Sequence, residues 1–176
     1  MDVVKIVITG PVGAGKTTLI NSVSKFAIIN TEANSSEDIG KPTTTVALDH
    51  GILDLGNVQL HLYGTPGQER FDFVWEVLAK GALGVVVLLR ADKPSQLPKA
   101  RYIRDFIASR ISVPVVVAPT HIDKTPHWGA TEISNFMRIP KEDVICTDPR
   151  TRDGALRPLK RVVEKVLQNS KAGKGG

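Results

Sequence analysis

Residues Gly10 to Thr17 read Gly-Pro-Val-Gly-Ala-Gly-Lys-Thr and match the pattern G-x-x-x-x-G-K-[ST] of a phosphate-binding loop. The segment follows the β-branched run Val3–Thr9 and precedes a segment that fits a helix, which is the context that the pattern requires. Its glycines allow successive backbone N–H groups to face inward around phosphate oxygens. We expect Lys16 to reach the β- and γ-phosphates of a nucleotide and the Thr17 hydroxyl to ligate Mg²⁺.

Three further polar segments each come at the end of a strand-like run. They contain side chains that accept or donate hydrogen bonds, and two of them contain a proline. Together with the phosphate loop, these segments contain the candidate functional residues of the chain. The segments are Gly64-Thr-Pro-Gly-Gln-Glu-Arg-Phe71, Thr120-His-Ile-Asp123 and Cys146-Thr-Asp-Pro-Arg150.

Strand-like and helix-like segments alternate in the order β-α-β-β-α-β-α-β-α-β-α, which is typical of an α/β fold whose mostly parallel sheet is covered by helices on both faces. The tight-turn signal Gly56-Asn57 makes one strand antiparallel, and we expect this to be the edge strand Thr45–Leu55. Residues 27–44 are polar and predict a long loop. The predicted strands are Val3–Thr9, Thr45–Leu55, Val58–Tyr63, Gly84–Leu89, Val113–Ala118 and Asp143–Thr147. The predicted helices are Lys16–Lys25, a short one after Phe71, about Pro98–Arg110, Thr131–Met137, and a last helix with the apolar stripe Leu156, Leu159, Val163, Val166 and Leu167.

The chain has 176 residues, of which 41% are hydrophobic and 23% are charged, as is ordinary for one globular domain. We expect a single domain over residues 1–170 and a flexible tail over 171–176. The net charge of +5 is concentrated from Arg150 onward, where aromatic residues are scarce, so we expect a solvated helix face and no nucleic-acid site. The sequence shows no signal peptide, membrane-helix run or lipidation signal, so we expect a cytoplasmic protein without a membrane anchor.

Taken together, the motifs resemble those of Ras-like small GTPases over most of the chain. Gly64–Phe71 stands where these proteins carry D-x-x-G-Q-E, Thr120–Asp123 where they carry N-K-x-D, and Cys146–Arg150 where they carry S-A-K. The wording Gly-Thr-Pro-Gly-Gln and the run Thr-Thr-Thr-Val-Ala-Leu-Asp-His-Gly are similar to a prokaryotic branch, akin to the MglA polarity proteins and to GTPases encoded with Roadblock proteins. The resemblance implies a Ras-like P-loop NTPase fold with a six-stranded, mostly parallel sheet, one antiparallel edge strand and helices on both faces.

The resemblance also implies a GTP/GDP switch that hydrolyses GTP slowly when alone, with a Roadblock-domain regulator and an effector as partners. Gln68 would orient the attacking water, and the Gly67 N–H would contact the γ-phosphate. Thr45 would complete the Mg²⁺ shell, with Thr43 and Thr44 as alternatives. The residues that the resemblance assigns to the nucleotide are Gly13, Ala14, Gly15, Lys16, Thr17, Thr18, Thr45, Gly67, Thr120, His121, Asp123, Asp148 and Pro149, with Thr17 and Thr45 as metal ligands.

Five positions depart from the pattern of that family. Gly64 replaces an aspartate that braces a Mg²⁺-bound water, so we expect weaker metal binding. Thr120 replaces an asparagine that ties the base loop to the phosphate loop, so we expect a less braced base loop. Pro149 replaces an alanine whose N–H binds the guanine carbonyl, and proline has no N–H. His121 replaces a lysine that lies along the base, and Val12 stands where many of these proteins have glycine.

Two alternatives to the switch are left open. A phosphate kinase resembling adenylate kinase would need an arginine-rich lid, for which Arg101, Arg104 and Arg110 are the nearby cluster. A non-catalytic nucleotide-binding scaffold is favoured by Gly64 and by the incomplete base loop.

Overall fold

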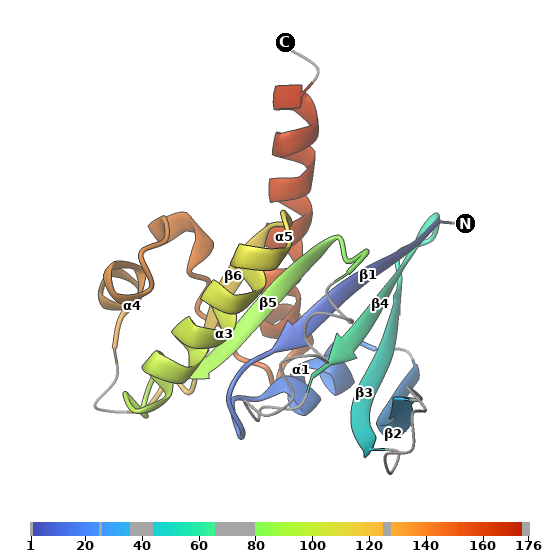
Figure 1. Ribbon diagram of the computed structural model, residues 1–176, viewed down its shortest axis with the longest axis horizontal. Coiled ribbons are helices and arrows are strands. Elements are labelled where there is room, and N and C mark those ends of the chain that lie inside the picture. The colour runs from blue at the N-terminus through green and yellow to red at the C-terminus, as the bar shows by residue number, and fades with distance from the viewer. Residues whose placement is uncertain (1, 25, 36–43, 66–79, 125–127, 174–176) are drawn as a thin grey trace.

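Runs of valine, isoleucine and leucine form buried strands at the centre of a mixed sheet that carries helices on both faces (Figure 1). The computed structural model describes residues 2–24, 26–35, 44–65, 80–124 and 128–173. Neighbouring strands follow the order β2-β3-β4-β1-β5-β6. The strands are β1 (Asp2–Thr9), β2 (Phe26–Ser35), β3 (Thr44–Asp54), β4 (Val58–Gly64), β5 (Gly84–Arg90) and β6 (Val115–Thr120). The helices are α1 (Lys16–Val23), α3 (Gln96–Arg110), α4 (Ala130–Met137), the short 3-10 helix η2 (Lys141–Asp143) and α5 (Arg152–Gly173).

Five of the predicted strands are found, with their ends shifted by one or two residues. β1 pairs in parallel with β4 and β5, and β5 pairs in parallel with β6. β3 runs antiparallel to β4, as the turn signal at Gly56 predicted. In this turn Gly56 has a φ of 87°, which glycine adopts without strain, and its N–H donates to Oδ1 of Asp54 at 2.9 Å. The resulting register places Asp54 opposite Gln59 and Asp49 opposite Gly64.

The edge of the sheet differs from the prediction. We expected a loop over residues 27–44 and an edge strand at Thr45–Leu55, but β2 pairs antiparallel with β3, so β2 is the edge and β3 is interior. The polar residues of the segment predicted a loop, whereas its Phe-Ala-Ile-Ile start favours a strand. Backbone pairing with β3 outweighs the polar composition, because the ladder hydrogen bonds do not depend on the side chains.

Residues 143–147 do not form the predicted strand. η2 occupies the start of the segment, and a single bridge joins Val144 to Val117 of β6. The N–H groups of Ile145 and Thr147 still donate to carbonyl oxygens of β6, at 2.8 and 2.9 Å. The segment therefore follows β6 without forming a regular ladder.

Asp143 provides the physical reason for this difference. Its side chain is buried and forms ion pairs with Arg161, at 3.1 Å, and with Lys165, both of α5. These contacts hold the start of the segment against α5. In a regular strand, residue 143 would instead pair along β6.

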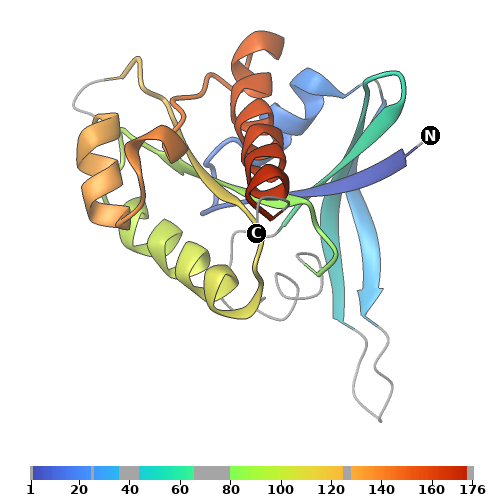
Figure 2. The same cartoon turned by 90° about the horizontal axis from the view of Figure 1, so that it is seen from above.

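Helices cover both faces of the sheet, as predicted. Figure 2 shows α1 and α5 on one side of the sheet and α3 on the other. α4 packs with α3, in the same apolar cluster. The predicted helix after Phe71 lies outside the described residues. The helix residues buried on the first face include Leu19, Ile20, Val23, Ala155, Leu159 and Val162, and those on the second include Leu97, Ile103, Ile107, Ile133 and Met137.

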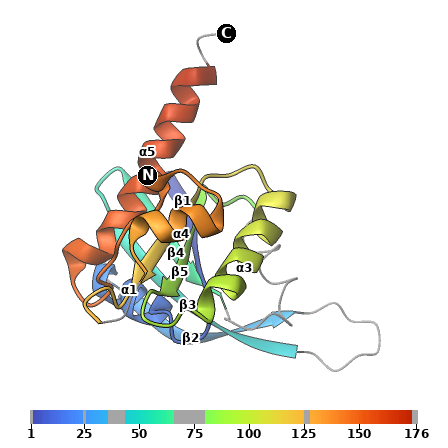
Figure 3. The ribbon, with the colours of Figure 1, turned by 90° about the vertical axis from the view of Figure 1, so that its left-hand side faces the viewer.

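The outer part of α5 projects beyond the body of the domain (Figures 1 and 3). The predicted apolar stripe is covered only in its first part, and Leu167 is 57% exposed. The helix continues to Gly173, past residue 170, where we placed the end of the domain. None of the helices in the described part of the chain has the length and apolar composition of a membrane span. The buried residues of α5 are Ala155, Pro158, Leu159 and Val162.

Candidate functional site

The phosphate loop connects β1 to α1, as its motif predicted. Gly13 and Gly15 have φ values of 77° and 111°, which turn the backbone back on itself before α1 begins at Lys16. Lys16 Nζ donates to two carbonyl oxygens of the loop, at 2.7 and 2.9 Å, so the ammonium group lies across it. Burial lowers the pKa of Lys16 to about 8, and the nearby carboxylate of Asp49 opposes that shift. The loop and its lysine thus have an arrangement that suits phosphate oxygens.

Thr120, the last residue of β6, braces the phosphate loop. Its buried hydroxyl donates to the carbonyl oxygen of Ala14 at 2.7 Å and lies 3.2 Å from that of Leu89. Nδ1 of His121 lies 3.0 Å from the same hydroxyl oxygen. The contact corrects the expectation that replacing asparagine by Thr120 leaves the base loop poorly braced, because the shorter threonine side chain still reaches the phosphate loop.

Pro149 packs directly on Gly15. A Cβ at Gly15 would lie 3.2 Å from Cγ of Pro149, so a side chain at Gly15 would press on the proline ring. The carbonyl oxygen of Pro149 accepts a hydrogen bond of 2.6 Å from Oγ of Ser22 in α1. The loop that contains Pro149 is therefore held against α1 and the phosphate loop without any N–H at this position.

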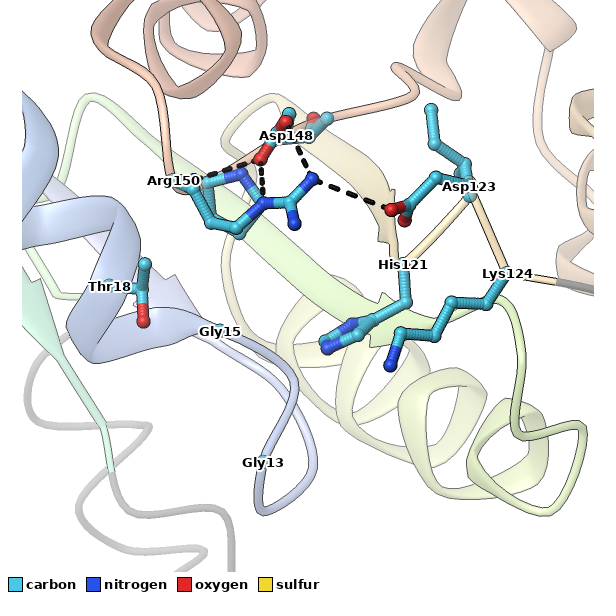
Figure 4. Close-up of a pocket in the computed structure, with 11 residues that line it drawn as sticks. Gly13, Gly15, Thr18, His121, Asp123, Lys124, Asp148 and Arg150 are labelled. Carbon is cyan, nitrogen blue, oxygen red and sulfur yellow. Dashed lines mark hydrogen bonds and ion pairs between the residues drawn. The ribbon is translucent and has the colours of Figure 1, made fainter.

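A pocket of about 480 Å³ opens between the phosphate loop and the two loops that contain Thr120–Lys124 and Thr147–Arg150. Its volume is in the range of small-molecule sites. Figure 4 shows the side chains of His121 and Lys124 on one side of the pocket, and the linked side chains of Arg150, Asp148 and Asp123 on another. The pocket is lined by Gly13, Gly15, Thr18, His121, Ile122, Asp123, Lys124, Thr147, Asp148, Pro149 and Arg150.

Arg150 links two carboxylates of this pocket (Figure 4). Its Nε lies 2.9 Å from Asp148, and its Nη2 lies 3.5 Å from Asp123. The hydrogen bond from Arg150 lowers the pKa of Asp148. The side chains of Arg150 and Asp123 are 66% and 56% exposed, so water screens their ion pair and a ligand can displace it.

His121 lies beside a strong ion pair at the end of β5. Arg90 pairs with Asp92 at 2.7 Å, and the hydrogen bond from Arg90 lowers the pKa of Asp92 to about 2. Burial lowers the pKa of His121, and the positive charge of Arg90 adds to the shift. Both effects favour the neutral form of the His121 imidazole.

Thr17 and Asp49 bring two oxygen donors together at the start of α1. Oγ1 of Thr17 donates to Oδ2 of Asp49, which lies on β3 opposite Gly64. Hydroxyl and carboxylate oxygens are ligands that Mg²⁺ prefers, so the pair fits the predicted metal. The described residues hold no group of three or more His, Cys, Asp and Glu side chains suited to a metal. A cation beside Thr17 would take its other ligands from water and phosphate, as Mg²⁺ usually does.

The structure brings most of the predicted nucleotide residues to one end of the sheet. Gly67 and Gln68 lie outside the described residues, as does Thr43. The backbone of Thr45 lies in β3 opposite Asn34, and its side chain is outside the description. The predicted residues that line the pocket are Gly13, Gly15, Thr18, His121, Asp123, Asp148 and Pro149, and those that stand beside them in the phosphate loop, α1 and β6 are Ala14, Lys16, Thr17 and Thr120.

Sequence reasoning missed Asp49, Ser22 and the ion pair that joins Arg150 to Asp123. A signal for Asp49 was present, because counting outward from the Gly56 turn pairs residue 49 with residue 64. The contacts of Ser22 and Arg150 depend on how closely loops from different parts of the chain approach, and the sequence carries no such signal.

Three relatives share part of this sequence. The chain is 29% identical over 136 residues to an uncharacterized protein of Methanocaldococcus jannaschii, which covers 77% of this chain and 80% of that protein. It is 30% identical over 100 residues to the intraflagellar transport protein 22 homolog of Xenopus tropicalis, or 53% of this chain and 50% of that protein. It is 26% identical over 121 residues to the ADP-ribosylation factor-like protein 8c of Arabidopsis thaliana, or 67% of this chain and 60% of that protein.

A family model described as conserved hypothetical ATP binding protein matches residues 27–171, which include both loops opposite the phosphate loop. The comparisons and the fold support a P-loop nucleotide-binding protein of the small-GTPase type. They do not bear on the MglA-like branch, which stays a prediction. With a match over most of its length, the chain belongs to the family of conserved hypothetical ATP binding proteins.

Proposed function

We propose that this protein binds a guanine nucleotide with Mg²⁺ and acts as a GTP/GDP switch that hydrolyses GTP slowly. The observation that carries the proposal is the pocket lined by both the phosphate loop and Asp123. Guanine presents two N–H donors to a carboxylate such as Asp123, whereas adenine offers a bare N1. A site built around such an acceptor rejects the base that leaves it unpaired.

Each part of the pocket has a role in this proposal. Lys16 and the first N–H groups of α1 hold the phosphates, and the Thr17 hydroxyl ligates the metal. Bound Mg²⁺ neutralises charge on the phosphates. In this proposal Thr45 ligates the metal in the GTP form, the N–H of Gly67 contacts the γ-phosphate, and Gln68 positions the attacking water.

Arg70 is the one arginine in the sequence of the proposed switch segments, which supports slow hydrolysis by the isolated chain, and Val12 bears on stimulation by a partner. Val12 is 66% exposed at the rim of the phosphate loop, and its carbonyl oxygen accepts a hydrogen bond of 3.0 Å from Nε2 of Gln96. The resemblance implies that an arginine supplied by a partner would approach the γ-phosphate beside Val12, so we expect this exposed side chain to hinder it. An arginine finger contributes about 10³–10⁵ to the rate in this chemistry, so the unassisted rate is expected to be well below one turnover per minute.

The proposed partner follows from the resemblance alone, and the proposed cellular location repeats the expectation from the sequence. We place the chain in the MglA-like branch, in the cytoplasm, with a Roadblock-domain protein that binds the GTP form. A pull-down with candidate Roadblock proteins should show stronger binding with GTP than with GDP. Equal binding of the two forms would contradict the switch.

An adenine nucleotide is the second candidate, because the family description names ATP. The kinase alternative has less support. Arg101 and Arg104 contact Asp105 on their own helix, and Arg110 lies 3.7 Å from the ring centroid of Phe106. These contacts explain the arginine cluster as part of α3.

Titration of the nucleotide-free protein with fluorescent GDP and ADP, with and without Mg²⁺, tests the proposal. GDP should bind at least about tenfold more tightly, since one lost carboxylate interaction is worth about 1.5–3 kcal/mol. Asp123→Asn should remove the preference, and Asp105→Asn on α3 is the matched control. Tighter binding of ADP by the wild type would favour the second candidate instead.

A further inference from the structure

The carboxylate of Asp49 faces the phosphate loop from a strand that the nucleotide motifs do not include. Thr17 is exposed at the start of α1, and its hydroxyl hydrogen points to Oδ2 of Asp49. A hydroxyl that donates its one hydrogen keeps its lone pairs for a cation. The charge of Asp49 also acts on Lys16, where it opposes the effect of burial on the lysine pKa. Two neighbouring residues of the phosphate site therefore respond to this one carboxylate.

Gly64 leaves the space that Asp49 occupies. The two residues lie opposite each other on antiparallel strands, so side chains at both positions would point to the same face. A Cβ at Gly64 would lie 3.2 Å from Cβ of Asp49 and 2.9 Å from Cδ1 of Ile20 in α1. Side chains at both strand positions would crowd each other beside α1, and glycine at position 64 leaves this space to Asp49.

Close packing of β3 against α1 fixes the distance between Asp49 and Thr17. Gly51 lies two residues after Asp49 and therefore on the same face of β3. A Cβ at Gly51 would lie 2.0 Å from Oγ of Ser24 and 2.6 Å from Cγ2 of Ile20, so the strand approaches the helix as closely as a glycine allows. The carboxylate is thus held by the packed core and does not depend on a surface loop.

From these contacts we infer that Asp49 is the positioning residue for Mg²⁺ at the phosphate loop and performs the bracing role that Gly64 lacks. It orients the Thr17 hydroxyl toward the cation and accepts a hydrogen bond from a water ligand of the cation. The inference rests on the proposed function. It replaces the expectation of weak metal binding, because the carboxylate is present and comes from β3 in place of β4.

The test uses the full chain loaded with a fluorescent GDP analogue. Its release is followed at free Mg²⁺ concentrations set by a chelator, which gives the Mg²⁺ midpoint for nucleotide retention. Asp49→Asn keeps the shape of the side chain and removes its charge. Loss of an outer carboxylate at a metal site commonly weakens metal affinity 10–100-fold, so the midpoint should rise by about that factor. Asp54→Asn, at the far end of the same strand, should leave the midpoint within about twofold.

A second variant moves the carboxylate back to the neighbouring strand. Asp49→Gly combined with Gly64→Asp removes the Cβ that crowds residue 64 and places the carboxylate on β4, so the Mg²⁺ midpoint should return to within about threefold of the wild type. Asp49→Gly alone should keep the raised Mg²⁺ midpoint. A merely structural role of Asp49 would not predict this rescue. If Asp49→Asn does not fold, the double variant decides the question on its own.

The outcomes separate this inference from the proposed function. A wild-type protein that retains no guanine nucleotide, or retains it independently of Mg²⁺, overturns both. If the wild type needs Mg²⁺ to retain the nucleotide and Asp49→Asn has the same Mg²⁺ midpoint, only the role of Asp49 is overturned. Failure of the double variant to recover, when it folds, also contradicts the inference.

Discussion

The hydroxyl oxygen of Thr120 lies 2.7 Å from the carbonyl oxygen of Ala14, and both residues are fully buried where β6 meets the phosphate loop. The two residues are 106 positions apart in the sequence, so the bond joins the phosphate side of the pocket to its base side. A buried acceptor that loses its donor destabilises a protein by about 1–3 kcal/mol. The contact therefore contributes to stability as well as to the shape of the pocket.

Replacing Thr120 by valine should lower both the free energy of unfolding and the affinity for nucleotide. Valine has nearly the shape of threonine but lacks the hydroxyl, so the Ala14 carbonyl loses its donor at a cost of about 1–3 kcal/mol. Urea denaturation of the nucleotide-free proteins measures the change. Thr120→Ser keeps the hydroxyl and serves as the control. A valine variant as stable as the wild type would show that this hydrogen bond does not contribute to the free energy of unfolding.

Removing the Lys16 side chain by Lys16→Ala should weaken GDP binding about ten- to a hundredfold, because a charge-assisted hydrogen bond is worth about 1.5–3 kcal/mol. Calorimetry measures the two affinities. Lys5→Ala is the matched control, since Lys5 Nζ also donates to a backbone carbonyl, that of Lys80 at 2.8 Å, and lies on β1 away from the phosphate loop. Equal loss in both variants would point to a general charge effect.

Pro149→Ala should tighten GDP more than ADP. Alanine restores an N–H that can donate to the guanine carbonyl, a gain of about 0.5–1.5 kcal/mol or roughly two- to tenfold. The proline ring also packs on Gly15, so Pro140→Ala, outside the pocket, controls for the loss of a proline. Parallel titrations with GDP and ADP give the ratio, and an equal gain for both nucleotides would contradict this reading of the base loop.

Asp143→Asn should destabilise the fold by about 3 kcal/mol and leave nucleotide binding unchanged. The buried carboxylate neutralises Arg161 and Lys165, whose side chains are only 15% and 23% exposed, and Arg161 would keep the exposed Glu164 as a partner. Removing one member of such a buried group is strongly destabilising. Thermal and urea denaturation measure the loss, with the exposed Asp153→Asn as the control. Weaker GDP binding with unchanged stability would mean that Asp143 acts on the pocket and not on α5.

The sequence predicted the parts of the fold that local patterns determine. Short runs rich in Val and Leu, as in Gly84–Leu89, suit strands covered on both faces, and the glycine-rich loop before Lys16 requires a strand before it and a helix after it. The hairpin followed from the Gly56 turn. β2 was missed because its strand state depends on pairing with β3, which its polar residues do not encode.

The residues of the candidate site that belong to sequence motifs could be predicted. The contacts between segments that are far apart in the sequence could not. Lys16 and Thr17 were predicted from the spacing of the phosphate-loop motif, and Asp123 from the resemblance to Ras-like small GTPases. The Thr120 contact depends on how closely β6 approaches Ala14, and the exchange of Gly64 for Asp49 appears only when the register of two strands is drawn. The motif on β4 does not show that the neighbouring strand β3 supplies the carboxylate that is missing at Gly64.

The projecting part of α5 is a suitable place to attach a label to the domain. The helix starts next to the pocket loop at Arg152 and runs for 22 residues, about 33 Å at 1.5 Å per residue. A fluorophore or a surface linker attached at the exposed Ser170 would therefore be carried well away from the nucleotide. Because the first half of the helix is packed into the core, such a label would tumble with the whole domain, and its anisotropy would report the binding of a partner without touching the pocket.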